Sequence, residues 1–229
     1  SFTVRKGEVL GIYGLMGAGR TELLESLAGN MDKAEGGIKL DGVRIDGMDT
    51  KERIAAGLVL IPEERQREGL FLNLEVNKNL TMASIGKYAR RGLHIQNAEE
   101  KVGVAKMIES MGIKVASPEI NISALSGGNQ QKVVIGRALL TNPKILMMDE
   151  PTRGIDVGAK SDVFKIVDSM AKEGFGILLV SSELEEVVSM SDRILVLCKG
   201  QVAGGFDRSE VNEETIRKAS EQGTCVDID

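Results

Sequence analysis

The sequence predicts an α/β fold, with a mainly parallel sheet flanked by helices, some antiparallel strands and an inserted helical subdomain. Two observations support this prediction. Short apolar runs alternate with stretches whose apolar residues recur at helical spacing, which is typical of strands joined by crossover helices. From Gln66 to about Asn129 the strand signals stop and the pattern becomes helical. We therefore expect a core of residues 1–65 and 132–229, and a helical subdomain of residues 66–131.

The first part of the predicted core alternates strands, turns and one helix. Residues 1–4 have the composition of a strand already under way, so we expect one or more strands of the domain to precede the residues given. Glycines and turn residues separate the elements that follow. In order, we expect a strand over 8–13, a glycine-rich loop, a helix that ends at Gly29, a hairpin over 38–45 and a buried strand over 58–61.

The insert and the last part of the core follow the same logic. Val104, Ile108 and Met111 share one helix face, behind Asn97 as the cap and Glu100 as its capping-box partner. The sheet then resumes in apolar runs that are separated by an amphipathic helix. We expect strands over 145–148, 177–180 and 194–197, a helix around 163–170, a hairpin punctuated by Gly200, and a last helix over 210–220.

Composition and charge exclude several classes of protein. The chain has 229 residues, 42% of them hydrophobic, which suits one large domain with an inserted subdomain. A net charge of -5, with 3% aromatic residues and no Trp, argues against a nucleic-acid groove, which would need a basic face and stacking rings. No apolar run approaches the roughly 20 residues of a membrane span, and the N-terminus lacks the layout of a signal peptide. We expect a soluble, cytoplasmic chain that binds no nucleic acid.

A glycine-rich loop follows the second predicted strand and has the spacing G-x-x-x-x-G-[KR]-[ST] of a P-loop. Between a strand and a helix, the backbone N–H groups of such a loop surround a phosphate, and the helix dipole favours the negative charge. The residues expected at the phosphates are Gly14, Gly17, Ala18, Gly19, Arg20 and Thr21, with the Thr21 hydroxyl on Mg²⁺. The alternative is an ordinary glycine turn.

Two carboxylates end the strand predicted over 145–148. Asp149 is placed to hold Mg²⁺ through water, and Glu150 is the candidate base that orients or polarises an attacking water. The alternative is an acidic pair that only solvates the end of a strand. The four apolar residues before the pair and Pro151-Thr152 after it favour the catalytic interpretation.

A third motif, Leu125-Ser126-Gly127-Gly128-Asn129-Gln130-Gln131, opens a predicted helix. A serine and two glycines at a helix start expose backbone N–H groups to an anion. The alternative is a plain helix cap by Ser126, and we expect that cap in either case.

Together the three motifs resemble those of an ABC-transporter ATPase domain, and the resemblance covers essentially the whole chain. The motifs span residues 14–21, 125–131 and 145–156. The residues of these motifs resemble those in the second, C-terminal ATPase half of a bacterial monosaccharide importer of the ribose, galactose and xylose type. The resemblance implies a P-loop NTPase core of the RecA-like kind that uses ATP and Mg²⁺.

The resemblance also implies partners and a place of action. A second ATPase half, in the same native polypeptide, would pair head-to-tail with this one. Residues of the third motif, namely Ser126, Gly127, Gly128 and Gln130, would then contact the nucleotide bound to the partner's P-loop. Membrane permease subunits would dock on the helical insert at the cytoplasmic side of the cell membrane, and a periplasmic or extracellular sugar-binding protein would act through them.

Three residues depart from the family's pattern at one site. Arg20 stands where the family usually has Lys, and a planar guanidinium is not equivalent to a compact ammonium. Glu63 stands where the family places a metal-ligating Gln, and Ser182 replaces a His that reaches the γ-phosphate. The third motif is unaltered. We therefore expect this domain to contribute a complete third motif to the nucleotide site of its partner, while its own nucleotide site is weakened. Asp156, in the loop that crosses to the opposing domain in the family, either couples the two sites or only caps the next helix.

Two alternatives remain open at this stage. The domain is either an active ATPase or a catalytically weak regulatory half that binds nucleotide. A soluble ABC-type ATPase of DNA repair or translation is the other alternative, and the acidic composition and the lack of a coiled-coil insert disfavour it.

Overall fold

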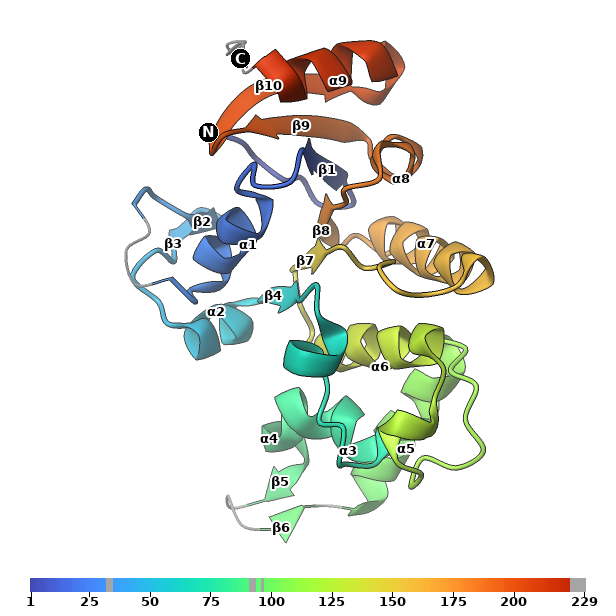
Figure 1. The fold of residues 1–229 in the computed structure, drawn as a ribbon. Coiled ribbons are helices and arrows are strands. Elements are labelled where there is room, and N and C mark those ends of the chain that lie inside the picture. The colour runs from blue at the N-terminus through green and yellow to red at the C-terminus, as the bar shows by residue number, and fades with distance from the viewer. Residues whose placement is uncertain (32–34, 91–93, 96, 223–229) are drawn as a thin grey trace. The chain divides into compact units, whose positions relative to one another are not determined.

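The computed structural model describes residues 1–31, 35–90, 94–95 and 97–222 (Figure 1). They form two compact units. The first consists of Ser1–Leu60, Lys144–Pro151 and Val167–Asp229, and the second of Ile61–Pro143 and Thr152–Ile166. The second unit contains more of the chain than the segment 66–131 expected to be helical, and the division into a core and a helical subdomain at those residues stays a prediction.

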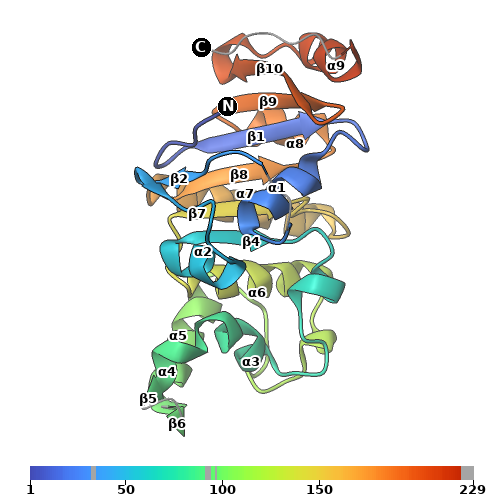
Figure 2. The same ribbon diagram turned by 90° about the vertical axis from the view of Figure 1, so that its left-hand side faces the viewer.

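A mixed, mostly parallel sheet is the centre of the first unit, as predicted. Its order is β10-β9-β1-β8-β7-β4 (Figure 2). The pairs β9/β1, β1/β8 and β8/β7 are parallel, and β10 is antiparallel to β9. The strands are β1 (Val9–Gly14), β4 (Leu58–Ile61), β7 (Ile145–Asp149), β8 (Gly176–Val180), β9 (Arg193–Cys198) and β10 (Gln201–Asp207).

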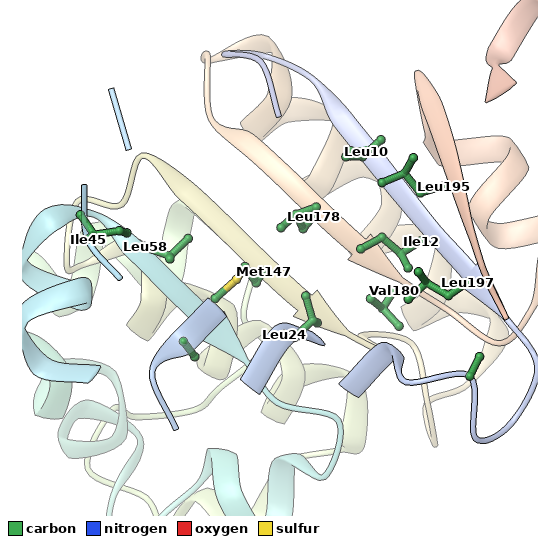
Figure 3. Close-up of a cluster of buried hydrophobic side chains, with 12 residues drawn as sticks. Leu10, Ile12, Leu24, Ile45, Leu58, Met147, Leu178, Val180, Leu195 and Leu197 are labelled. Atoms are coloured by element: carbon green, nitrogen blue, oxygen red, sulfur yellow. The ribbon is translucent and has the colours of Figure 1, made fainter. Parts of the chain in front are cut away.

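Both faces of this sheet are buried, which explains why its strands are apolar throughout rather than alternating. On one face, Leu10 and Ile12 of β1 pack in a cluster with Leu24 of α1 (Arg20–Ala28), and Figure 3 shows these side chains. On the other face, Tyr13 of β1 belongs to a cluster with Val187 of α8 (Leu184–Met190) and Ile216 of α9 (Glu213–Gln222). Successive residues of β1 therefore anchor helices on opposite sides of the sheet.

The hairpin predicted over 38–45 is present, but it is shorter. It consists of β2 (Lys39–Leu40) antiparallel to β3 (Val43–Arg44). A helix that the periodicity did not indicate, α2 (Thr50–Ala56), follows it and begins with a capping box between Asp49 and Glu52. Its Arg53 is 5% exposed and donates hydrogen bonds to four backbone carbonyls, which compensates the burial of its charge.

The N-terminal strand is a wrong prediction, because residues 1–5 are not part of any strand. Side chains provide the contacts of this segment instead of a strand ladder. The Arg193 guanidinium donates a hydrogen bond of 2.7 Å to the Thr3 carbonyl, and the backbone N–H of Arg5 donates to the Glu8 carboxylate. The strand proper begins at Val9.

The second unit is mainly helical. Its helices are a π-helix (Arg65–Gly69), α3 (Val76–Thr81), a 3₁₀ helix (Met82–Ser84), α4 (Ile85–Tyr88), α5 (Asn97–Ser110), a 3₁₀ helix (Ile122–Ala124) and α6 (Gly127–Leu139). A short antiparallel pair, β5 (Ala89–Arg90) and β6 (His94–Ile95), was not predicted. Helix α7 (Val157–Lys172) begins in this unit and ends in the first.

The carboxylate expected in a capping box at the start of α5 has another role. Glu100 is 5% exposed, pairs with Lys78 at 3.2 Å and accepts a hydrogen bond of 2.8 Å from Thr81. It therefore ties α5 to α3 inside the unit. None of the helices that the structure describes combines the length and apolar character needed to span a lipid bilayer.

Candidate functional site

Two of the three predicted motifs, together with Ser182, meet at one edge of the sheet in the first unit. Gly14 ends β1 and Asp149 ends β7, while Ser182 follows the end of β8. The strand register sets Asp149 beside Val180, and Val180 beside Ile12. Because these strands are parallel, their carboxyl ends share one edge, which is where open α/β sheets bind ligands.

The glycine-rich loop joins β1 to α1 in a conformation that requires glycine. Gly17 and Gly19 have φ angles of 79° and 92°, in the left-handed region. The backbone of Ala18 is held on both sides, because its N–H donates to Leu15 and its carbonyl accepts from Gly200, each at 3.0 Å. No side chain caps the N-terminus of α1, so the N–H groups of its first turn remain for an anion.

Asp149 and Thr21 form the part of this edge that suits a divalent cation. Asp149 is 3% exposed, and burial raises the pKa of its carboxyl from 3.8 to about 6, although a hydrogen bond with Thr21 opposes the shift. Its Oδ1 is buried without a hydrogen-bond partner among the described residues. An orphaned carboxylate oxygen beside a hydroxyl fits Mg²⁺, which takes few protein oxygens and completes its shell with phosphate and water.

The protein offers few ligands to a cation near Asp149 and Thr21. Among the described residues there is no group of three or more His, Cys, Asp or Glu side chains that could hold a metal by themselves. A cation at Asp149 and Thr21 would therefore depend on oxygens from a bound phosphate. That requirement couples metal binding to nucleotide binding.

Glu150, the predicted base, is held by two side chains. Its Oε1 lies 3.1 Å from the Arg20 guanidinium, and its Oε2 accepts a hydrogen bond of 3.2 Å from the Ser182 hydroxyl. Its φ of 45° is rare for a residue other than glycine and marks stored backbone strain of the kind found at functional sites. The structure thus brings together all three residues and shows that Arg20 faces a carboxylate of its own unit.

Glu63 lies in the second unit, where it forms an ion pair with Arg153. The neighbouring Arg65 donates hydrogen bonds of 2.7 Å and 3.0 Å to the carbonyls of Arg153 and Gly154. The loop after β4 is therefore bound to the loop after Pro151 by two arginines. Neither arginine was among the predicted site residues, and the only sequence signal for Arg65 is a charged run directly after a buried strand.

The third motif opens α6, also in the second unit. Ser126 occupies the N-cap position, but its side chain does not cap the helix, so the predicted cap bond is absent. Instead, the hydroxyl accepts a hydrogen bond of 3.0 Å from the side-chain amide of Asn129. Ser126 remains exposed to solvent.

Gly127 and Gly128 allow close approach of other elements of the same unit. A Cβ on Gly127 would lie 2.7 Å from the Arg65 guanidinium, and one on Gly128 would lie 2.4 Å from the Ala159 Cβ. The short distance to Ala159 shows that packing against α7 requires glycine at position 128.

Asp156 caps α7, which is one of the two roles expected for it. Its Oδ1 accepts a hydrogen bond of 3.0 Å from the Ala159 N–H.

Gln130, which we predict to contact a nucleotide on another ATPase half, is buried and hydrogen-bonded within the second unit. The side chain is 4% exposed, and its amide nitrogen donates to the carbonyls of Ile122 and Leu125 at 3.3 Å each. Its oxygen accepts from Gln66, also at 3.3 Å. These bonds fix the turn that precedes α6, and the nucleotide contact of Gln130 stays a prediction.

Comparison with known proteins places this geometry in a family. The profile of the ABC transporter family matches residues 1–153. The xylose import ATP-binding protein XylG of Moorella thermoacetica is 47% identical over 226 residues, a match that covers 97% of this chain and 44% of the relative. The ribose import ATP-binding protein RbsA of Geobacillus kaustophilus is 43% identical over 223 residues, with 97% and 45% covered. The chain spans somewhat less than half the length of these two relatives.

The fold agrees with solved structures. A nucleotide-free ATP-binding cassette from an ABC transporter superposes with a TM-score of 0.80 at 24% sequence identity, covering 97% of this chain and 88% of that one. At this identity the likeness concerns the fold alone. It confirms the predicted α/β architecture of the P-loop NTPase kind.

Proposed function

Because this chain belongs to the ABC transporter family and is one of its ATPase domains, we propose that it binds MgATP and that hydrolysis powers the import of a monosaccharide across the cytoplasmic membrane. One observation carries the proposal on the structural side. Asp149 is buried with an unpartnered oxygen beside Thr21, at the sheet edge where the glycine-rich loop leaves its N–H groups uncapped. The two similar import proteins are named for xylose and ribose, which supports a monosaccharide as the transported substrate.

We infer the following roles for the residues of each unit. The backbone from Gly14 to Thr21 binds the phosphates, and Thr21 and Asp149 hold Mg²⁺. Mg²⁺ neutralises phosphate charge that develops in the reaction. Glu150 orients the attacking water once its contact with Arg20 is released. Ser126, Gly127 and Gly128 act on a nucleotide bound by another ATPase half.

The proposal includes the partners expected from the resemblance. The two import proteins are more than twice as long as their matched segments, which supports a second ATPase half in the same polypeptide, paired head-to-tail with this one. Membrane permease subunits docked on the helical subdomain, residues 66–131, would place the chain at the cytoplasmic face of the membrane. A sugar-binding protein would act through those subunits.

A second candidate function has specific support. The Arg20–Glu150 ion pair and the Ser182 bond to the same carboxylate occupy the groups that hydrolysis requires. This arrangement would be expected of a catalytically weak half that binds nucleotide and contributes its third motif to the nucleotide site of the partner. The two candidates differ only in whether this half turns over ATP.

The test uses the full-length protein that contains this chain. MgATP at a hundredfold excess over Kd should raise the free energy of unfolding by about 2.7 kcal/mol, and Asp149→Asn should remove most of that gain. In vesicles that carry the permease and are supplied with the sugar-binding protein, xylose or ribose should stimulate ATP hydrolysis. A protein without either nucleotide stabilisation or sugar-stimulated hydrolysis would contradict the proposal.

A variant of the full-length protein in which the P-loop of the other half is inactivated decides between the two candidates. In this variant only the present half can hydrolyse ATP. Residual turnover identifies this half as an active ATPase, whereas binding without turnover identifies the regulatory half.

A further inference from the structure

Asn129 links the Ser126 hydroxyl to the turn that follows α5. Its amide nitrogen donates to Ser126 Oγ at 3.0 Å, and its amide oxygen accepts from the backbone N–H of Lys114 at 2.8 Å. One short side chain therefore connects the turn after α5 to the serine of the third motif. All three residues belong to the second unit.

The orientation of the amide is dictated by its neighbour. A backbone N–H can only donate, so the oxygen of Asn129 must face Lys114 and the nitrogen must face Ser126. A serine hydroxyl has one proton and two lone pairs. Because one lone pair of Ser126 accepts from Asn129, the hydroxyl proton points elsewhere.

The anchor of this arrangement is itself fixed. Ile113, directly before Lys114, is 5% exposed, and its N–H donates to the Ile108 carbonyl at 2.9 Å. Lys132, one turn beyond Asn129 on α6, donates to the Gly112 carbonyl and pairs with Asp162 at 2.7 Å. The turn that holds Asn129 is thus bound to α6 at two positions about one helical turn apart, Asn129 and Lys132.

The consequence concerns what Ser126 presents to solvent. At a helix start, a serine oxygen usually accepts from a backbone N–H of the first turn. Here the Asn129 side chain replaces that donor, and Ser126 does not cap α6. Both the hydroxyl proton and the N–H groups at the start of α6 then remain for an external acceptor of negative charge.

We propose that Asn129 is a positioning residue, which keeps Ser126 a hydrogen-bond donor toward a phosphate oxygen of the nucleotide held by the other ATPase half. The proposal rests on the proposed function and adds to it a residue that does not itself contact the nucleotide. Its test is reversal of the hydrogen-bond polarity rather than simple removal.

Asn129→Asp provides this reversal. The carboxylate still accepts from the Lys114 N–H, but its other oxygen cannot donate, so the Ser126 proton turns toward it. Asn121→Asp is the matched control, because it adds the same charge in the same unit, while its Oδ1 is already an acceptor for Ser123. In the complete transport complex, Asn129→Asp should lower kcat by roughly 10- to 100-fold, the worth of a hydrogen bond to a charged group. Asn121→Asp should leave kcat within about twofold.

The double variant separates action through Ser126 from a general effect of charge. In a Ser126→Ala background, Asn129→Asp should lower kcat by less than about threefold, because the orienting bond is already absent. Losses that multiply in the double variant would overturn the proposal. If Asn129→Asp does not fold, as judged by its urea midpoint, Asn129→Ala takes its place in both backgrounds with the same criterion.

Failure of the inference is distinguishable from failure of the proposed function. A wild-type complex without nucleotide hydrolysis would overturn the proposed function, and this inference with it. Wild-type hydrolysis together with a folded, fully active Asn129→Asp variant would overturn the inference alone.

Discussion

The Arg20 guanidinium and the Glu150 carboxylate form an ion pair of 3.1 Å, in which the two side chains are only 14% and 9% exposed. The cation of the glycine-rich loop and the candidate base thus neutralise each other. An incoming phosphate has to compete with Glu150 for Arg20. We therefore expect nucleotide binding to release Glu150 from Arg20.

Glu150→Gln should tighten MgATP binding and abolish hydrolysis by this half. The amide keeps the shape of the side chain but removes the charge that competes with phosphate, so Kd should fall by roughly tenfold, which corresponds to about 1.4 kcal/mol. Loss of the base should lower turnover at this site at least about 100-fold. Titration calorimetry and single-turnover hydrolysis measure the two effects.

Glu22→Gln is the control for Glu150→Gln. It removes a carboxylate from the exposed first turn of α1, without an ion pair to Arg20. Equal tightening by both substitutions would show that total charge, and not the release of Arg20, controls affinity.

Asp149→Asn should stabilise the nucleotide-free protein at neutral pH. The pKa of Asp149 is about 6 in the folded chain and 3.8 without burial. The folded state therefore binds more protons between these values, and its free energy of unfolding falls as pH rises through that window. Above the window the penalty is complete, so the amide should add about 3 kcal/mol at pH 7.5, and the gain should vanish near pH 4.

Thermal unfolding in EDTA at several pH values tests this linkage. Asp168→Asn, an exposed position in α7, should change stability little at any pH. A gain for Asp149→Asn that does not vary with pH would show that charge burial is not its cause.

Ser126→Arg and Arg20→Ala should affect transport unequally. Ser126 presents its hydroxyl to solvent at the start of α6, whereas Arg20 serves a site already altered at Ser182. Sugar uptake into vesicles should be abolished by Ser126→Arg and largely retained by Arg20→Ala. Ser123→Arg, on the exposed turn before the motif, controls for the bulk and charge of the new side chain. Comparable losses from Ser126→Arg and Arg20→Ala would refute the asymmetry of the two sites.

Gly128→Ala should destabilise the second unit although alanine favours helices. The added Cβ would meet the Ala159 Cβ at 2.4 Å, so α6 and α7 must separate, at a cost of about 1–3 kcal/mol. Gly86→Ala in α4 is the matched control, because no atom lies within 4 Å of its added Cβ. It should be neutral or stabilising by up to about 1 kcal/mol. Urea unfolding compares the two, and equal effects would exclude the packing explanation.

Much of the fold was predictable because it depends on local patterns. Apolar runs that are buried on both faces, such as β8, and the glycine-rich loop with its fixed spacing indicate their structure within a few residues of chain. The prediction was wrong at residues 1–4, where the composition of a strand is present but side-chain contacts such as Arg193 to Thr3 replace the ladder. It also missed α2, whose capping box is a recognisable signal although its apolar face is short.

The sequence by itself determined which chemical groups this protein carries: a P-loop, two carboxylates at a strand end, and a serine with two glycines at a helix start. Tertiary structure decided how those groups are used. Only the parallel register of β1, β7 and β8 brings Arg20, Glu150 and Ser182 into contact across the chain. Only the turn after α5 directs the Asn129 amide toward Ser126. Spacing within a motif is local and readable from sequence, whereas the donor that meets each acceptor depends on contacts between residues distant in the chain.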